Sequence, residues 1–229
     1  MVNVVKERAY DARFRPFFKM ILAGPSGSGK TLWLYQFLKS HELIMSTPPA
    51  NVILYYNTWQ EVYDKMKADN MVNKFIKGYP SVSSVEELSE YSPIGGSLLI
   101  IDDQALSANK DLARIFTVTA RHSSTSIIYI TQNIFTKNQY SRDISLQATY
   151  LVLFKNPRDN SAIKYLASQI MPNNPAFISN VYKDSLKEPY SYLIIDLHQQ
   201  TQDAIRYRTN IFPYEYPVVV YIPTGAVTL

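Results

Sequence analysis

The sequence predicts an α/β domain in which helices flank a mainly parallel central sheet, with extra strands at one sheet edge near the C-terminus. Two observations predict the parallel part: short apolar runs rich in β-forming residues recur along the chain, and amphipathic segments separate them. Continuous apolar strands indicate a sheet buried on both faces, and intervening helices allow parallel pairing. A third observation, a group of closely spaced strand-like segments after Met171, predicts the edge strands.

The length and composition are those of one globular domain. The chain has 229 residues, of which 46% are hydrophobic and 18% are charged, so it can bury a substantial core. No internal repeat or low-complexity linker divides it. We therefore expect a single domain over residues 1–229, with an N-terminal extension over 1–15 and the edge-strand region over 172–229.

The composition also excludes several kinds of site. The chain has no cysteine, which excludes a disulfide partner and a thiolate metal site. Its histidines, His41, His122 and His198, lie far apart, which disfavours a zinc site. No apolar run approaches the ~20 residues that span a bilayer, and the N-terminus lacks the apolar core of a signal peptide. We expect a soluble, intracellular protein without a membrane partner, whose net charge of +4 permits a nucleic-acid partner without requiring one.

The first elements are a strand, a helix and a second strand. Phe17–Ala23 is a short apolar run that leads directly into a glycine-rich loop. Residues 31–40 carry apolar side chains at helical spacing. Asn51–Tyr56 follows the turn-like segment STPPA and is apolar and rich in β-forming residues.

A polar stretch comes next, before another strand. Helical fragments are predicted around Val62–Met66 and Val72–Ile76. A further helix is predicted over residues 84–91, where Ser84 and Glu87 have the spacing of a capping box. Gly95–Asp103 is then a short apolar strand that begins at a Gly-Gly turn.

The alternation continues in the second half of the chain. Residues 109–122 place apolar side chains on one helical face, and Ser126–Asn133 and Thr149–Asn156 are two more apolar strands. Three strand-like segments follow at residues 191–197, 204–212 and 217–223. Their close spacing favours antiparallel strands added at the sheet edge.

The glycine-rich loop carries the strongest functional signal. Its sequence GPSGSGKT matches GxxxxGK[ST], the P-loop pattern that holds nucleotide phosphates, and the predicted strand and helix on either side are the expected context. The predicted nucleotide-binding residues are Gly24, Pro25, Ser26, Gly27, Ser28, Gly29, Lys30 and Thr31. The glycines allow successive N–H groups to face the phosphates beside a helix N-terminus, which favours anions. Lys30 would bridge the β- and γ-phosphates, and Thr31 would offer its hydroxyl to Mg²⁺.

Two carboxylates end the strand that follows the Gly-Gly turn. Asp102 is predicted to reach the Mg²⁺ that Thr31 holds, because Mg²⁺ binds a few carboxylates and keeps several waters. Asp103 would act as the base that orients the attacking water. An Asp-Asp pair at a strand end is otherwise a turn signal, and its place downstream of a P-loop favours the catalytic interpretation.

Gln132 ends the next strand, SIIYITQ. A glutamine there can hydrogen bond the γ-phosphate and sense its presence. The alternative is a polar residue that only keeps a strand end soluble. Its position after the acidic strand favours the sensor.

Two arginines are candidates for completing the site of a neighbouring subunit. Arg121 precedes the Gln132 strand, and Arg158 follows the strand after it. An arginine that stabilises transition-state charge on the γ-phosphate contributes ~10³–10⁵ in rate. The alternative for either residue is an ordinary surface charge.

Taken together, these motifs resemble the FtsK–HerA superfamily of DNA-pumping ATPases. The segment ARHSSTSIIYITQN is similar to that superfamily's arginine, short polar stretch, apolar strand and Thr-Gln. The segments TYLVLFKNPRDNSAIKYLASQIMP and YSYLIIDLHQQTQDAIRYRTNIFP resemble genome-packaging ATPases of Polinton-like and adintovirus-like elements, which are related to the poxvirus-type enzymes. The resemblance runs from about Arg13 to Pro213 and is weakest between Trp59 and Pro93.

The resemblance implies an ASCE, RecA-like P-loop ATPase with five parallel strands, the P-loop strand inside, and edge additions. It implies ATP and Mg²⁺ as cofactors, and a homo-oligomeric ring of five or six copies that drives double-stranded DNA into a preformed capsid. Capsid or portal-vertex proteins would be further partners. The chain itself would act in a host cell during virion assembly or would be associated with the virion. The superfamily's Mg²⁺ acid carries over to Asp102, its sensor to Gln132 and its trans-acting arginine to Arg121. Many members have Asp-Glu where this chain has Asp-Asp, which leaves the role of Asp103 open.

Other P-loop classes are weighed against this one. A nucleotide or small-molecule kinase would need an arginine-rich lid, and a switch GTPase would need an [NT]KxD motif; neither occurs here. A non-hydrolysing P-loop protein is disfavoured because Lys30, Thr31 and Asp102 are all present. A DNA pump for segregation or conjugation remains an alternative within the same superfamily.

Overall fold

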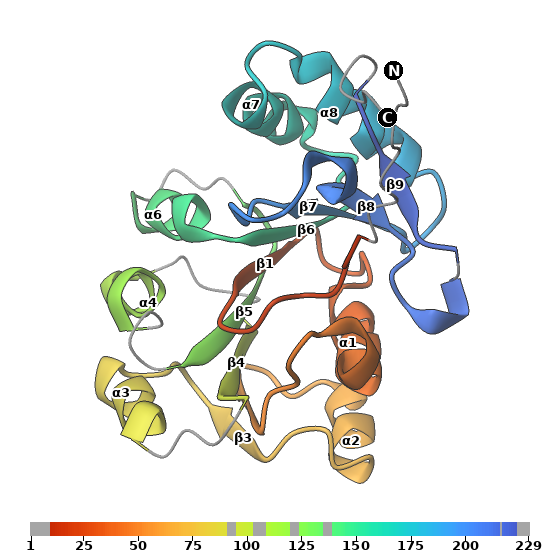
Figure 1. Ribbon diagram of the computed structural model, residues 1–229. Coiled ribbons are helices and arrows are strands. Elements are labelled where there is room, and N and C mark those ends of the chain that lie inside the picture. The colour runs from red at the N-terminus through yellow and green to blue at the C-terminus, as the bar shows by residue number, and fades with distance from the viewer. Residues whose placement is uncertain are drawn as a thin grey trace, which may run out of the picture.

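The computed structural model describes residues 10–90, 95–102, 109–119, 124–134, 139–215 and 217–223. These residues form one sheet in the order β3-β2-β4-β5-β1-β6-β7-β8-β9, with helices on both faces (Figure 1). The strands are β1 Lys19–Ala23, β2 Asn51–Tyr56, β3 Lys74–Lys77, β4 Ser97–Asp102, β5 Thr125–Thr131, β6 Tyr150–Phe154, β7 Tyr192–Asp196, β8 Tyr207–Thr209 and β9 Val219–Tyr221. The helices are α1 Lys30–Ile44, α2 Glu61–Ala68, α3 Val82–Glu90, α4 Lys110–Arg114, α6 Gln139–Gln147, α7 Asn160–Ile170 and α8 Pro175–Ser185, with short turns η1 Ile115–Thr119, η2 Asp203–Ile205 and η3 Pro213–Glu215.

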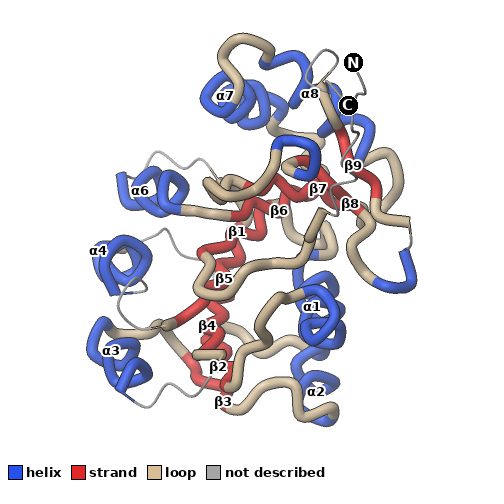
Figure 2. The backbone as a smooth tube through the Cα atoms, in the orientation of Figure 1, coloured by secondary structure: helices blue, strands red, loops and turns tan. Residues whose placement is uncertain are grey.

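The sheet lies between two helical layers (Figure 2). Helices α1 and α2 cover one face, and α3, α4, α6 and α7 cover the other (Figure 1). Alternate residues of β1 point into the two cores, Met20 and Leu22 toward α1 and Ile21 toward the opposite layer. All five residues of β1 are buried, as expected for a strand covered on both faces.

Parallel pairing brings the ends of the central strands together. Ala23, the last residue of β1, is level with Thr131 of β5 and with Leu153 of β6. On the far side of β5, Asp102 of β4 is level with Ile130. The segments that follow β1, β4, β5 and β6 therefore leave the sheet on the side where the carboxyl ends of these strands lie. We call this side the carboxyl edge; it is distinct from the outer strands β3 and β9.

Most strand predictions are confirmed. The five apolar segments from Phe17–Ala23 to Thr149–Asn156 form β1, β2, β4, β5 and β6. The segments after Met171 form β7, β8 and β9, which pair antiparallel with β6 and with one another. The sheet is thus mixed, with the antiparallel strands at one edge as predicted.

Two predictions in the polar stretch are wrong. The sheet has six parallel strands rather than five, because residues 74–77 form β3 beside β2 where a helical fragment was expected around Val72–Ile76. This edge strand is only four residues long and has a lysine at each end, so it lacks the long apolar run of a central strand. Helix α3 also begins earlier than predicted: Ser81, not Ser84, caps it, and the two serines exchange hydrogen bonds of 3.1 Å.

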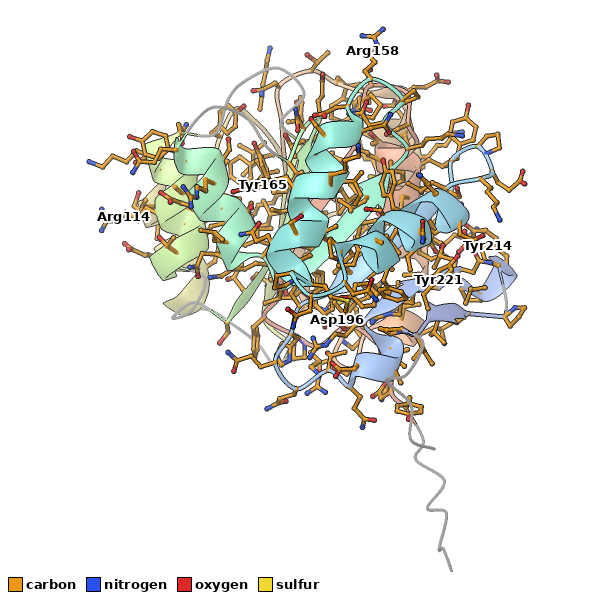
Figure 3. The ribbon with its side chains drawn as sticks, turned by 90° about the horizontal axis from the view of Figure 1, so that it is seen from above. Arg114, Arg158, Tyr165, Asp196, Tyr214 and Tyr221 are labelled. Carbon is orange, nitrogen blue, oxygen red and sulfur yellow. The ribbon has the colours of Figure 1, made fainter. Side chains whose placement is uncertain are left out.

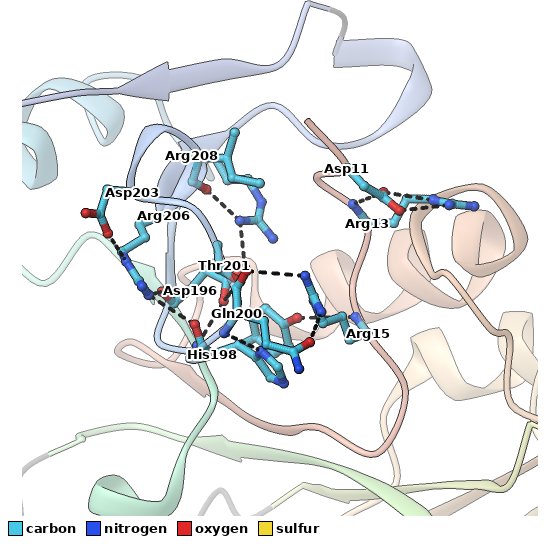
Figure 4. Close-up of polar contacts among 12 residues, drawn as sticks. Asp11, Arg13, Arg15, Asp196, His198, Gln200, Thr201, Asp203, Arg206 and Arg208 are labelled. Carbon is cyan, nitrogen blue, oxygen red and sulfur yellow. Dashed lines mark hydrogen bonds and ion pairs between the residues drawn. The ribbon is translucent and has the colours of Figure 1, made fainter. Parts of the chain in front are cut away.

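A buried ion pair ties the antiparallel strands together (Figure 4). Arg208 Nη1 of β8 donates to Asp196 Oδ2 at the end of β7 over 3.0 Å, and both side chains are buried. The Arg208 guanidinium also lies 5.6 Å from the centre of the Phe14 ring. The other carboxylate oxygen, Asp196 Oδ1, accepts a hydrogen bond from the Thr201 hydroxyl.

Among the helices of the described residues, none combines the length and apolar character needed to cross a membrane.

Candidate functional site

The glycine-rich loop connects buried β1 to α1 at the carboxyl edge. A Cβ on Gly24 would lie 2.7 Å from both Phe154 Cβ and Ser28 Oγ, so only glycine fits there. Gly27 and Gly29 have φ angles of 77° and 100°, in the left-handed region that favours glycine. The strand, loop and helix predicted around GxxxxGK[ST] are therefore present, and the loop has the backbone that the pattern requires.

The start of α1, at the end of the loop, lacks a side-chain cap. Helix α1 begins at Lys30 with Gly29 as its N-cap, so no side chain caps the helix and its first turn has no acidic residue. The Ser28 hydroxyl is buried and has no hydrogen-bond partner among the described residues. The first N–H groups of an α-helix have no intrahelical acceptor, and together with the unpartnered Ser28 hydroxyl they fit an anionic ligand such as a phosphate. Thr31 lies in the first turn and is half-buried.

Lys30 lies across the loop. Its ammonium donates to the carbonyl oxygens of Gly24 and Pro25 over 2.6 Å and 2.8 Å, and the residue is buried. Burial lowers the pKa of Lys30, while the nearby Asp102 carboxylate acts in the opposite direction. A desolvated cation at the mouth of the loop is electrostatically strong, because water does not screen it.

Asp102 faces the same helical layer as Lys30. Along β4, Asp102 is on the same face as Leu98 and Ile100, which pack under α1 and α2. Its Oδ2 accepts hydrogen bonds from Gln60 Nε2, over 2.5 Å, and from the hydroxyl of Tyr63. Burial and the adjacent carboxylate raise the pKa of Tyr63, so this phenol stays a donor.

Gln60 and Tyr63 were not predicted from the sequence. Both come from the start of α2, in the polar stretch where the motifs are weakest. The only local signal is a glutamine placed immediately before a helical fragment, which occurs commonly. Their role becomes visible only once β2 and β4 pair and bring α2 over the end of β4.

Gln132 lies beside the glycine loop. It follows β5, whose Thr131 carbonyl accepts a hydrogen bond from Gly24 N over 3.3 Å. Gln132 and Gly24 line the same small cavity of about 40 Å³. The structure therefore brings together the loop, Lys30, Asp102 and Gln132, from three neighbouring strands.

The remaining candidates are placed differently. Asp103 and Arg121 lie outside the described residues. Arg158 is exposed in the loop after β6, at the carboxyl edge, whereas Asp196 lies toward the opposite edge of the sheet (Figure 3). The backbone N–H of Arg158 donates to Asn156 Oδ1 over 3.1 Å. Arg158 is thus exposed to solvent at the same carboxyl edge as the glycine loop, on the side of that loop where β6 lies.

No protein-family model and no curated protein matches this sequence. Among solved structures, the chain is similar to the genome packaging NTPase B204 of Sulfolobus turreted icosahedral virus 2, solved in complex with ATP-gammaS; the two share 15% identity and a TM-score of 0.54 over 91% of this chain and 98% of that one.

Two archaeal proteins show a weaker likeness. They are the KaiC-like protein PH0186 of Pyrococcus horikoshii (13% identity, TM-score 0.47, 94% of this chain and 99% of that one) and the flagellar accessory protein FlaH of Methanocaldococcus jannaschii (13% identity, TM-score 0.45, 92% of each). The likeness to B204 shows the fold, and together with the glycine loop it makes this an α/β fold of the P-loop NTPase type.

Proposed function

We propose that this chain is an ATP-hydrolysing motor that translocates double-stranded DNA and packages it into a preformed capsid. One arrangement carries the proposal: a glycine loop with a buried lysine, and a buried aspartate two strands away on the same face of the sheet. In the order β4-β5-β1, one strand separates the acidic strand from the loop strand, and the polar Gln132 directly follows that strand. This order supports an ASCE-type ATPase.

Each residue of the site has a separate proposed role in phosphoryl transfer. Bound Mg²⁺·ATP supplies the γ-phosphoryl group and the metal that neutralises part of its charge. The loop N–H groups and Lys30 would hold the phosphates, and the Thr31 hydroxyl and the Asp102 carboxylate would face the metal. Gln132, next to Gly24, is suited to sense the γ-phosphate. Asp103 keeps its proposed role as the base that orients water.

The DNA partner has support from a positive groove at the carboxyl edge. A cavity of about 550 Å³ between α7, α8 and the loop after β6 is lined by four lysines. These are Lys155, Lys164, Lys183 and Lys187, of which Lys187 also pairs with Asp184. Lysines that follow one groove suit a phosphodiester backbone, whose binding depends on charge and not on sequence. The similar structure B204 is itself a genome packaging NTPase, which motivates testing a nucleic-acid partner here.

Hydrolysis measured with and without double-stranded DNA tests the proposal. We expect Mg²⁺-dependent release of phosphate from ATP that double-stranded DNA stimulates, and no phosphate transfer to nucleosides or small alcohols. Reversing Lys155 and Lys183 together to glutamate should remove the stimulation and leave basal hydrolysis. Hydrolysis that DNA never stimulates under conditions where rings form would contradict the motor, and phosphate transfer to a small acceptor would indicate a kinase.

A further inference from the structure

Tyr190 lies against the glycine loop although nothing in its local sequence indicates a functional site. A Cβ placed on Gly29 would be 3.1 Å from Tyr190 Cδ1, 3.4 Å from its Cβ and 3.7 Å from its Cα. Gly29 is the N-cap of α1 and directly precedes Lys30. The aromatic ring therefore borders the part of the loop where the phosphates are proposed to bind.

Packing does not account for this tyrosine. Its exposed fraction is 67%, among the highest of the large hydrophobic side chains in the described part of the chain. Its φ of 62° lies in the left-handed region, which is unfavourable for a residue with a bulky side chain. An exposed aromatic in a strained conformation gains little from the fold, and such strain is typical of functional positions.

A tight turn holds Tyr190 in this conformation. Ser191 N donates to the carbonyl of Glu188 over 3.4 Å, and Ser191 Oγ donates to the same oxygen over 2.7 Å. Pro189 occupies the second position of this turn and Tyr190 the third, where a positive φ normally selects glycine or asparagine. The turn thus presents the ring beside the loop before β7 begins at Tyr192.

The expected orientation of a bound nucleotide places its base near Tyr190. Asp102 and Gln132 follow β4 and β5, on one side of β1, whereas β6 and β7 lie on its other side. If the γ-phosphate faces Asp102 and Gln132, the ribose and base of an elongated nucleoside triphosphate must extend toward β6 and β7. Tyr190 lies on that side, within contact distance of Gly29.

We propose that Tyr190 stacks on the purine base of the bound nucleoside triphosphate; this inference rests on the proposed ATPase function. A phenol ring offers a flat apolar face, and stacking on it is tolerant of base identity because every base has a π-face. Tyr190 therefore supplies affinity for the nucleoside and does not discriminate strongly between adenine and guanine.

Binding measurements with a base-free ligand test this role. Dissociation constants for Mg²⁺·ATP, Mg²⁺·GTP and inorganic tripolyphosphate are measured by calorimetry on wild type, Tyr190→Phe, Tyr190→Ala and Tyr190→Gly. We expect Tyr190→Phe to resemble wild type, and Tyr190→Ala and Tyr190→Gly to bind both nucleotides about tenfold more weakly. Tripolyphosphate affinity should not change. Tyr165→Ala, which removes another exposed tyrosine, on α7, is the matched control and should bind like wild type.

The outcomes separate the two proposals. Because glycine relieves the positive φ at this turn, Tyr190→Gly should fold at least as well as wild type, so its weaker nucleotide binding cannot be attributed to misfolding. Wild-type ATP affinity in Tyr190→Ala would overturn the stacking role. An equal loss of tripolyphosphate affinity would also overturn it, since the residue would then act only by shaping the loop. If wild type itself binds no nucleotide, the proposed ATPase function fails first.

Discussion

The Tyr63 hydroxyl donates a hydrogen bond to Oδ2 of Asp102, and both side chains are buried. Gln60 donates to the same oxygen. Through these contacts, the start of α2 orients the carboxylate that is proposed to face the metal. Partners of this kind commonly tune metal sites, because they fix the direction of the liganding oxygens. The Tyr63 ring also packs edge-on against the exposed Trp59, with centroids 5.5 Å apart.

We expect Tyr63→Phe to raise the Mg²⁺ concentration needed for half-maximal hydrolysis by about tenfold, because Asp102 loses one of the donors that orient it. The substitution keeps the ring in the core and removes one hydrogen bond to a buried carboxylate, so the loss of stability should be about 1.5–3 kcal/mol. Magnesium titration of the hydrolysis rate measures the first effect and denaturant unfolding the second. Tyr35→Phe is the matched control, since it removes an exposed Tyr–Asp hydrogen bond of 2.9 Å that does not involve Asp102. An unchanged magnesium requirement in Tyr63→Phe would show that the contact is structural only.

Lys30→Met should abolish hydrolysis without lowering the melting temperature. The substitution removes the charge proposed to act on the transferred phosphoryl group. It also removes a charge whose burial is unfavourable, as the lowered pKa of Lys30 indicates. Phosphate release and thermal unfolding measured on the same preparation check both effects. Retained hydrolysis would contradict the proposed role of Lys30.

The pH dependence of stability follows from the sign of that shift. A pKa lowered in the folded state means that the unfolded chain binds the Lys30 proton more tightly, so this group favours folding more as pH rises. The advantage of Lys30→Met over wild type should therefore shrink between neutral pH and the ordinary lysine range. Unfolding curves at several alkaline pH values measure the difference. A constant difference would show that Lys30 is not desolvated.

Arg208→Met should destabilise the chain by about 3–5 kcal/mol, because it leaves the buried Asp196 carboxylate without its cation. Replacing both partners, as Arg208→Met with Asp196→Leu, should recover much of this loss. Arg13→Met provides the control: its pair with Asp11 is about half exposed, so water screens it and its loss should destabilise the chain far less than the loss of Arg208. Chemical denaturation of the four proteins gives the comparison. A loss of under 1 kcal/mol in Arg208→Met would mean that the pair contributes no more than a surface one.

The sequence predicted the features that arise from local signals. Apolar runs such as Phe17–Ala23 and the glycines of the loop carry their structure within a few residues, and both were located correctly. Strand β3 was missed because its stability comes from pairing with β2 and not from its own four residues. The contacts of Tyr63 with Asp102 and of Tyr190 with Gly29 join segments far apart in the chain, so no local pattern announces them.

The last prediction concerns a ring in which one subunit completes the site of the next. Arg121 is the proposed trans-acting residue, because it precedes the strand that ends at Gln132 beside the loop. Part of the transition-state charge on the γ-phosphate, which Lys30 and the metal do not cover, then stays unneutralised in an isolated subunit. We expect hydrolysis per chain to rise with protein concentration until rings saturate. Arg121→Ala should bind ATP but fail to hydrolyse it.

Mixing two inactive variants distinguishes an arginine that acts in trans from one that acts within its own chain. A Lys30→Met subunit has a defective loop but an intact Arg121, whereas an Arg121→Ala subunit has the reverse. In a mixed ring, the arginine of the first can serve the loop of the second, so the mixture should recover part of the wild-type rate. The rate should peak at an intermediate ratio, because productive sites need both kinds of neighbour. If co-assembled mixtures stay inactive, Arg121 does not act in trans. The same mixing experiment with Arg158→Ala then tests the exposed arginine on the β6 side of the loop.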